Sequence, residues 1–125
     1  MKPETSRAAA FAATTLLLST TVCAHHSGAM FDDKKSVTLE GTVRQFQWTN
    51  PHCWIQLTVA APSGPVEWSI EMGAPSQLFQ AGWRPSTLKF GDKIRLTVHP
   101  ARDGAPGAVY VSGARLDGQP LTKKT

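Results

Sequence analysis

The sequence predicts an all-β domain with one short helix, folded as a small five-stranded barrel. Hydrophobic and polar residues alternate over several short stretches, as they do in strands that bury one face. Loops rich in glycine and proline separate these stretches. One short helical segment lies between the third and fourth stretches, which is the order of elements in barrels of the OB type. A small β-sandwich is the alternative architecture.

The first three strands are expected between residues 37 and 72. The first runs from Val37 to Trp48, and Gly41 within it indicates a bulge or a bend. After a turn at residues 49–51, residues 52–59 alternate, with His52 and Trp54 on one face and Cys53 on the other. The third strand covers residues 66–72 and follows a hairpin loop.

A short helix and two further strands complete the expected barrel. Ser76 is expected to cap a helix over residues 77–81, and Gly82 suits the position just after its end. A fourth strand follows the turn at residues 90–92, and a fifth covers residues 108–116. The residues expected to point into one core are Ile55, Leu57, Val59, Val66, Trp68, Ile70, Ile94, Leu96 and Val98.

The first 24 residues are typical of a secretory signal peptide. Lys2 and Arg7 precede an apolar stretch that is too short to span a bilayer, and Val22-Cys23-Ala24 predicts cleavage after Ala24. We therefore expect export to the periplasm. The expected organisation is a signal peptide over 1–24, an amino-terminal arm over 25–35, the barrel over 36–118 and a flexible tail over 119–125.

Composition argues against several classes of protein. The chain has 13 Lys and Arg against 9 Asp and Glu, and this mild excess is not clustered as in nucleic-acid-binding proteins, so no nucleic acid is expected as a partner. The region after the cut has no second apolar segment, so no transmembrane segment is expected there. Neither a Ser-His-Asp order nor a phosphate-binding glycine loop nor a CxxC motif occurs, and an enzyme is not expected.

Two histidines at the expected new amino terminus are the main chemical clue. Cleavage before His25 gives that residue a free α-amino group, and the amine and imidazole together can chelate Cu(II), with His26 as a further nitrogen ligand. A cut one residue earlier places His26 third, which also makes a tight copper or nickel chelate. The alternative is that two polar residues simply follow the cut.

Other candidate ligands lie on the expected barrel. His52 follows Asn50-Pro51 in a loop that borders the ligand face of OB-type barrels, and His99 ends the fourth strand near the same face. Glu71 is expected to point outward beside His52, where it can orient a ligand histidine or bind a metal, although glutamates at such positions are more often merely solvated. For each histidine the alternative is a local hydrogen bond.

Several motifs resemble a bacterial exported family that is catalogued only as a domain of unknown function. They are His25-His26-Ser27, Thr49-Asn50-Pro51-His52-Cys53-Trp54, Trp68-Ser69-Ile70-Glu71-Met72-Gly73-Ala74-Pro75, Gly82-Trp83, Leu88-Lys89-Phe90-Gly91-Asp92 and Arg102-Asp103-Gly104. The resemblance implies a small periplasmic β-barrel with no settled activity. It points to His25, His26, Asn50, His52, Trp54 and Glu71, while His99 lies outside these motifs.

Two functions follow from the sequence. The first is an exported small protein that binds a metal, with copper as the expected cofactor and His25, His26 and His52 as ligands. The second is a metal-free OB-type module that binds a glycan, a peptide or an envelope protein through Trp54 and the strand face around it. In either case the expected partner is an envelope protein or a small ligand.

Overall fold

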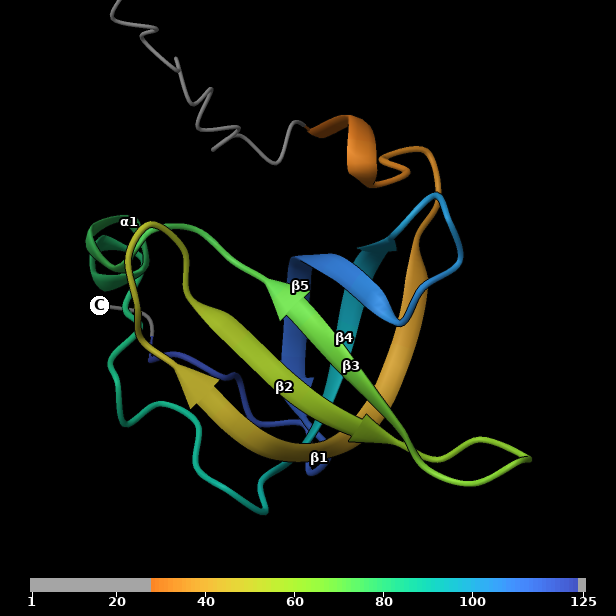
Figure 1. Ribbon diagram of the computed structural model, residues 1–125. Helices are drawn as coiled ribbons and strands as arrows, with labels where there is room; N and C mark the ends of the chain where they lie inside the picture. The colour runs from red at the N-terminus through yellow and green to blue at the C-terminus, as the bar shows by residue number, and fades with distance from the viewer. Residues whose placement is uncertain (1–27, 124–125) are drawn as a thin grey trace, which may run out of the picture.

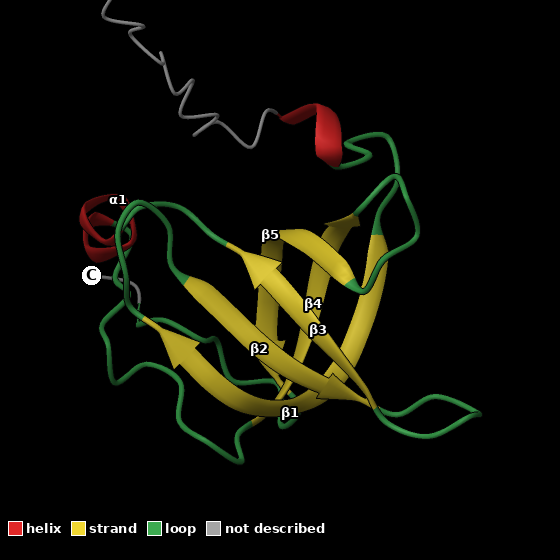
Figure 2. Ribbon diagram, in the orientation of Figure 1, coloured by secondary structure: helices red, strands yellow, loops and turns green. Residues whose placement is uncertain are grey.

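Five strands close into a barrel in the computed structural model of the protein, which describes residues 28–123 (Figure 1). The elements in chain order are a 3-10 helix η1 (Gly28–Met30), β1 (Val37–Gln47), β2 (Trp54–Val59), β3 (Val66–Glu71), the helix α1 (Pro75–Gln80), β4 (Lys93–Pro100) and β5 (Gly107–Arg115). Strands form the wall of the barrel, and the two short helices lie outside it (Figure 2).

The order of strands around the barrel is β1-β2-β3-β5-β4, and β4 closes back onto β1. Every neighbouring pair is antiparallel except β3 and β5, which run parallel. The prediction of an all-β fold with one short helix in a small OB-like barrel is confirmed. The closed ring of strands excludes the alternative of two stacked sheets in the described part of the chain.

Gly41 lies where β1 passes from one neighbour to the other. It is paired with Val59 of β2 and with Ile94 of β4. A Cβ atom at this position would overlap the carbonyl oxygen of Thr58, so only glycine lets the strands approach this closely. The bulge itself lies farther along, between Val43 and Gln45, where the register with β2 shifts.

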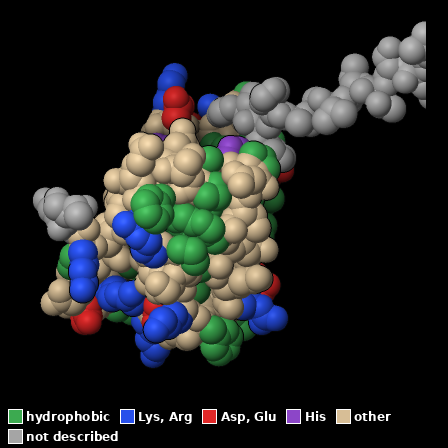
Figure 3. All heavy atoms as spheres, turned by 90° about the vertical axis from the view of Figure 1, so that its left-hand side faces the viewer, with side chains coloured by type: hydrophobic (Ala, Val, Ile, Leu, Met, Phe, Trp, Pro, Cys, Tyr) green, Lys and Arg blue, Asp and Glu red, His purple; other side chains and the backbone are tan. Residues whose placement is uncertain are grey.

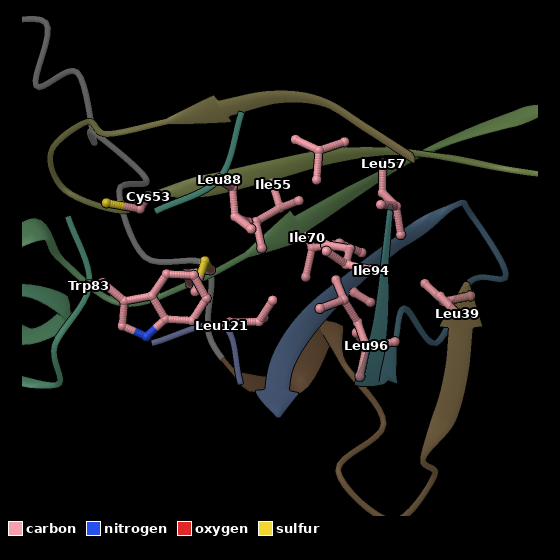
Figure 4. Close-up of a cluster of buried hydrophobic side chains, with 14 of the residues drawn as sticks. Leu39, Cys53, Ile55, Leu57, Ile70, Trp83, Leu88, Ile94, Leu96 and Leu121 are labelled. Atoms are coloured by element: carbon pink, nitrogen blue, oxygen red, sulfur yellow. The ribbon is translucent and has the colours of Figure 1, made fainter. Parts of the chain in front are cut away.

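The core fills the barrel from end to end. Figure 4 shows Ile55, Ile70, Ile94 and Leu96 in the middle, with Leu39 towards one end and Trp83 and Cys53 towards the other. The core prediction is confirmed for six residues that are fully buried: Ile55, Leu57, Ile70, Ile94, Leu96 and Val98.

Three predicted core positions are less buried than those six. Val59 and Trp68 are partly buried and pack against the core from its edge. Val66 is half-buried and is not part of the core, because it begins β3 directly after the hairpin loop. Alternation alone does not show where a barrel ends.

The start of α1 differs from the expected cap at Ser76. The helix begins at Pro75, and Ala74 is the residue before it. Proline suits the first helical position because it lacks an N–H, which would have no partner there. The Gln77 side chain accepts a hydrogen bond of 3.1 Å from the Ala74 N–H, so the cap comes from inside the first turn.

α1 ends just before a glycine, as predicted. Gly82 has a φ of 89° and donates its N–H to the Phe79 carbonyl at 3.1 Å. The next N–H, from Trp83, bonds to the Leu78 carbonyl at 2.9 Å, which is the Schellman pattern. Leu78 and Trp83 are both buried, so this turn attaches the helix to the open end of the core.

The residues expected to form a flexible tail are instead held against the barrel up to Leu121. Pro120 bridges to Ala114, the Arg115 N–H bonds to the Gln119 carbonyl at 2.8 Å, and Leu121 is buried. The segment is thus held by backbone contacts with the end of β5 and by one apolar side chain in the core. Neither helix between residues 28 and 123 is long and apolar enough to cross a membrane.

Candidate functional site

A contact between His52 and Glu71 forms the centre of the candidate site. Nδ1 of His52 lies within hydrogen-bond distance of Oε1 of Glu71. The Glu71 side chain is 8% exposed, whereas the His52 side chain is 38% exposed. The histidine therefore lies between a buried carboxylate and solvent.

Glu71 was expected on the outward face of β3 beside His52, and its contact with that histidine excludes the alternative that it is merely solvated. It does point away from the core, because its register neighbour is Trp54 and its chain neighbours Ile70 and Met72 are in the core. It is nevertheless the one buried charged side chain in the described region. The register places it between Trp54 on β2 and Val109 on β5, and His52 covers its carboxylate.

The backbone on both sides of His52 is fixed by hydrogen bonds. The Thr49 hydroxyl donates to the His52 carbonyl at 2.8 Å, and the peptide bond between Asn50 and Pro51 is cis. Immediately after His52, Cys53 pairs with the end of β3: its N–H bonds to the Gly73 carbonyl at 3.0 Å. These hydrogen bonds fix the backbone position from which the His52 imidazole extends.

Cys53 is not available to this site. Its side chain is fully buried on the core face, as the alternation predicts, and it is the free cysteine of the described region. Burial raises the pKa of its thiol. A metal ligand must be a thiolate, so both the direction of the side chain and its chemistry exclude Cys53 as a partner of His52.

A row of hydrogen-bonded polar side chains continues the outward face below Trp54. Gln56 donates to Gln47 at 2.9 Å, and the Ser69 hydroxyl donates to Gln56 at 2.6 Å. Trp54 is half-buried between this row and the His52–Glu71 pair, because Gln47 and Glu71 are its two register neighbours. On this outward face, Trp54 thus lies between the polar row and the His52–Glu71 pair.

His99 is held in a different way from His52. Its Nδ1 lies 2.6 Å from the Lys35 carbonyl oxygen. A carbonyl can only accept, so Nδ1 carries the proton and Nε2 keeps its lone pair. His99 is paired with Val109, which is paired with Glu71, so two strand spacings, about 10 Å, separate the backbones of His99 and Glu71.

The amino-terminal arm is attached to the loop between β4 and β5. The backbone N–H of Arg102 bonds to the Met30 carbonyl, and its Nε bonds to the Ala29 carbonyl. Phe31 forms a bridge with Ala101, and the Asp32 N–H bonds to the Pro100 carbonyl. Arg102 also lies 3.7 Å from Asp32 and from Asp33. These contacts determine where the chain from the terminus reaches the barrel.

The described residues do not make a complete metal site by themselves. Within residues 28–123, no three His, Cys, Asp or Glu side chains lie close enough together to hold a metal ion. His25 and His26 lie outside the described residues, as does the predicted signal peptide. Figure 1 shows η1 at the same end of the barrel as the loop that leads from β1 to His52 and β2.

Comparison with known families decides where the chain belongs. A family model with the description "Family of unknown function (DUF6152)" matches residues 14–110. The chain belongs to this family. The DUF6152 match includes His25, His26 and the His52–Glu71 pair, and it stops before Val111. A comparison with curated proteins finds no match.

A comparison of this DUF6152 protein with solved structures finds a low similarity to a DNA-binding protein. The mitochondrial single-stranded DNA binding protein Rim1 from S. cerevisiae is 13% identical, with a TM-score of 0.49. The match covers 66% of this chain and 94% of that chain. Similarity at this level carries no argument about a ligand.

Arg102 and the burial of Glu71 are the two features that sequence reasoning missed in this DUF6152 chain. Arg102 belongs to one of the quoted motifs, Arg102-Asp103-Gly104, but nothing in that motif names the arm as its partner. The burial of Glu71 had a clearer signal. The glutamate directly precedes the core residue Met72 and pairs with Trp54, so large side chains lie beside it.

Proposed function

We propose that this chain is an exported small protein that binds one copper ion through His52 and the histidines of its amino terminus, His25 and His26. The observation that carries the proposal is the contact of His52 Nδ1 with the buried Glu71 carboxylate. Histidines that bind metals commonly donate their other ring N–H to a carboxylate, which fixes the ring and makes it a stronger ligand.

The contact favours one nitrogen of His52 as the ligand. Nδ1 is the ring nitrogen that faces Glu71, so Nε2 is the nitrogen that can offer a lone pair to a metal. Among residues 28–123, no hydrogen bond or ion pair is recorded for Nε2. With the ring 38% exposed, Nε2 is the nitrogen that remains for a ligand from outside the described region.

The attachment of the arm to the barrel supports the proposal that the amino terminus supplies ligands to the same site as His52. Residues 29–33 are anchored to the loop before β5, and β5 pairs with β3 next to Glu71. His25 precedes Gly28 by three positions, and three positions of extended chain span at most about 10 Å. In this proposal the terminal amine and the imidazoles of His25 and His26 complete the nitrogen set that Cu(II) prefers.

The test compares copper affinity in the folded protein with that of a free peptide copying residues 25–35. Any terminal histidine binds some copper, so binding alone proves little. We expect the protein to bind at least about tenfold more tightly, which corresponds to about 1.4 kcal/mol. Equal affinity would mean that the barrel supplies no ligand.

A pair of matched variants identifies which barrel histidine takes part. His52→Gln removes the imidazole but keeps an N–H₂ that can donate to Glu71, and His99→Gln is the equivalent change at the other held histidine. We expect His52→Gln to reduce the affinity to that of the peptide and His99→Gln to leave it unchanged. The reverse result would place the site at His99.

Export and cleavage have a separate test. Intact mass of the protein recovered from the periplasm should correspond to a chain beginning at His25. Adding one residue before His25 converts its amine to an amide and should weaken copper binding. Recovery of uncut chain from the envelope, or a lipid on Cys23, would contradict the cleavage prediction.

The second candidate function is a metal-free binding module for a glycan, a peptide or an envelope protein. It is supported by the outward face, where Trp54 lies beside the polar row of Gln47, Gln56 and Ser69. A domain whose stability and Trp54 fluorescence are indifferent to copper favours this candidate. That the chain binds no nucleic acid stays a prediction.

A further inference from the structure

A second hollow lies at the end of α1, apart from His52 and Glu71. It is a cavity of about 480 Å³ between Gly82, the turn at residues 84–87, Arg115 at the end of β5, and residues 121–123. α1 lies on the left in Figure 1, on the side that Figure 3 faces, where several Lys and Arg side chains lie beside and below a hydrophobic area.

The charged side chains that line the cavity are all positive. Arg84, Arg115 and Lys123 line it, and none of the described lining residues is acidic. Arg115 is offset by an ion pair with Asp92 at 3.0 Å. Within residues 28–123, no carboxylate lies within ion-pair distance of Arg84 or Lys123. Within the described part of the chain, the wall therefore carries two positive charges, Arg84 and Lys123, that no carboxylate pairs with.

The two arginines are held in place before any ligand arrives. Arg84 donates to the carbonyls of Phe79 and Trp83 at 2.9 and 2.6 Å, and its guanidinium lies 3.7 Å from the centre of the Phe79 ring. Arg115 donates to Asp92 and to the Thr87 carbonyl. Cations that are already ordered lose little conformational entropy when they bind an anion.

The carboxyl-terminal wall is fixed as well. Leu121 is buried in the core while also lining the cavity. The backbone beyond it passes close to Gly82, where an added Cβ would lie 3.2 Å from the Lys123 carbonyl oxygen. The cavity thus has an apolar floor at Leu121 and hydroxyl groups at Ser86, Thr87 and Thr122.

We propose that this cavity binds a small organic anion, through a single phosphate or carboxylate group placed between Arg84 and Lys123. The size falls within the range of small-molecule sites, about 300–1,000 Å³. Leu121 takes the apolar part of the ligand, and the hydroxyl of Ser86 or Thr122 donates to the anionic group. The proposal is independent of copper binding.

The test is a titration of the purified protein with phenyl phosphate, followed by NMR and by calorimetry. Ser86→Glu adds a negative charge at an exposed lining residue for which no hydrogen bond is recorded, and Ser63→Glu adds the same charge in the β2–β3 hairpin loop. We expect Ser86→Glu to weaken binding by about fivefold or more and Ser63→Glu to leave it unchanged. Shifted amide signals should belong to residues 82–87 and 121–123.

Two further measurements complete the test. Lys123→Gln should weaken binding in the same direction, and raised ionic strength should weaken it too. Binding to vesicles of phosphatidylglycerol that is lost in Ser86→Glu would assign the anion to a lipid headgroup, and binding of the soluble probe alone would assign it to a free ligand. Absence of saturation, or equal affinity in Ser86→Glu and Ser63→Glu, overturns the proposal.

Discussion

The carboxylate of Glu71 is buried on the outer side of the barrel, and Nδ1 of His52 is in direct contact with it. The outer side of a small barrel is normally exposed to water, where a carboxylate needs no protein partner. Burying a charge there is unfavourable unless it is paired, so the contact with the histidine is a requirement of the fold as well as a feature of the site.

Replacing Glu71 with Gln should lower copper affinity about 10- to 100-fold, which is the usual effect of losing the partner that orients a ligand histidine. A competition titration measures this effect. Glu67→Gln is the matched control: Glu67 is on the same face of β3 but is exposed and paired with Arg44 at 2.9 Å. Equal losses in both variants would indicate an effect of net charge rather than of orientation.

Replacing Arg102 with Gln should release the arm from the barrel, because Arg102 bonds to the carbonyl of Ala29 through its side chain and approaches Asp32 and Asp33. We expect the Asp32 N–H, which bonds to the Pro100 carbonyl, to exchange with solvent faster, on the order of tenfold. Copper affinity should fall as well. Arg95→Gln, which removes an exposed arginine paired with Glu40, should change neither quantity.

Replacing Ile70 with Ala should lower the free energy of unfolding by about 2–5 kcal/mol, because Ile70 is fully buried in the centre of the core. Denaturant unfolding provides the measurement. Val111→Ala on β5 removes a side chain that is 45% exposed and should change the stability by about 0.5 kcal/mol at most. A small loss at Ile70 would contradict the closed barrel.

Asp92 should make stability depend on pH in the acid range. Burial alone would raise the pKa of its carboxyl, but the hydrogen bonds from the Lys89 N–H and Arg115 outweigh burial and lower it. A lowered folded-state pKa stabilises the protein above the unfolded-state pKa, and this stabilisation is lost as pH falls through the folded-state value.

Asp92→Asn should therefore be less stable than the parent protein at neutral pH, and the difference should shrink as pH falls below the unfolded-state pKa. Unfolding measured between neutral and strongly acid pH tests the prediction. A difference that stays constant with pH would show that the hydrogen bonds, and not the charge, account for the effect.

The strands and the core could be predicted because alternation is a local property. Ile55, Ile70 and Leu96 point inward because strand geometry sends every second side chain to the same face. The end of α1 was equally readable, because Gly82 supplies a backbone conformation that other residues rarely adopt. The start of α1 could not be predicted in this way. Both Pro75 and Ser76 are suited to the beginning of a helix, and only the tertiary packing determines which position is used.

The sequence by itself determined the all-β class, the inward face of the strands and the position of His52 just before β2, since all of these follow from neighbours along the chain. The tertiary structure decided between a barrel and a β-sandwich. The tertiary structure alone decided that Glu71 is buried, that Arg102 holds the arm, and that Arg84 and Lys123 line the same cavity. These relationships join residues that are distant in sequence, and barrel closure brings them together. Burial and pairing depend on that closure, so no local pattern could show them.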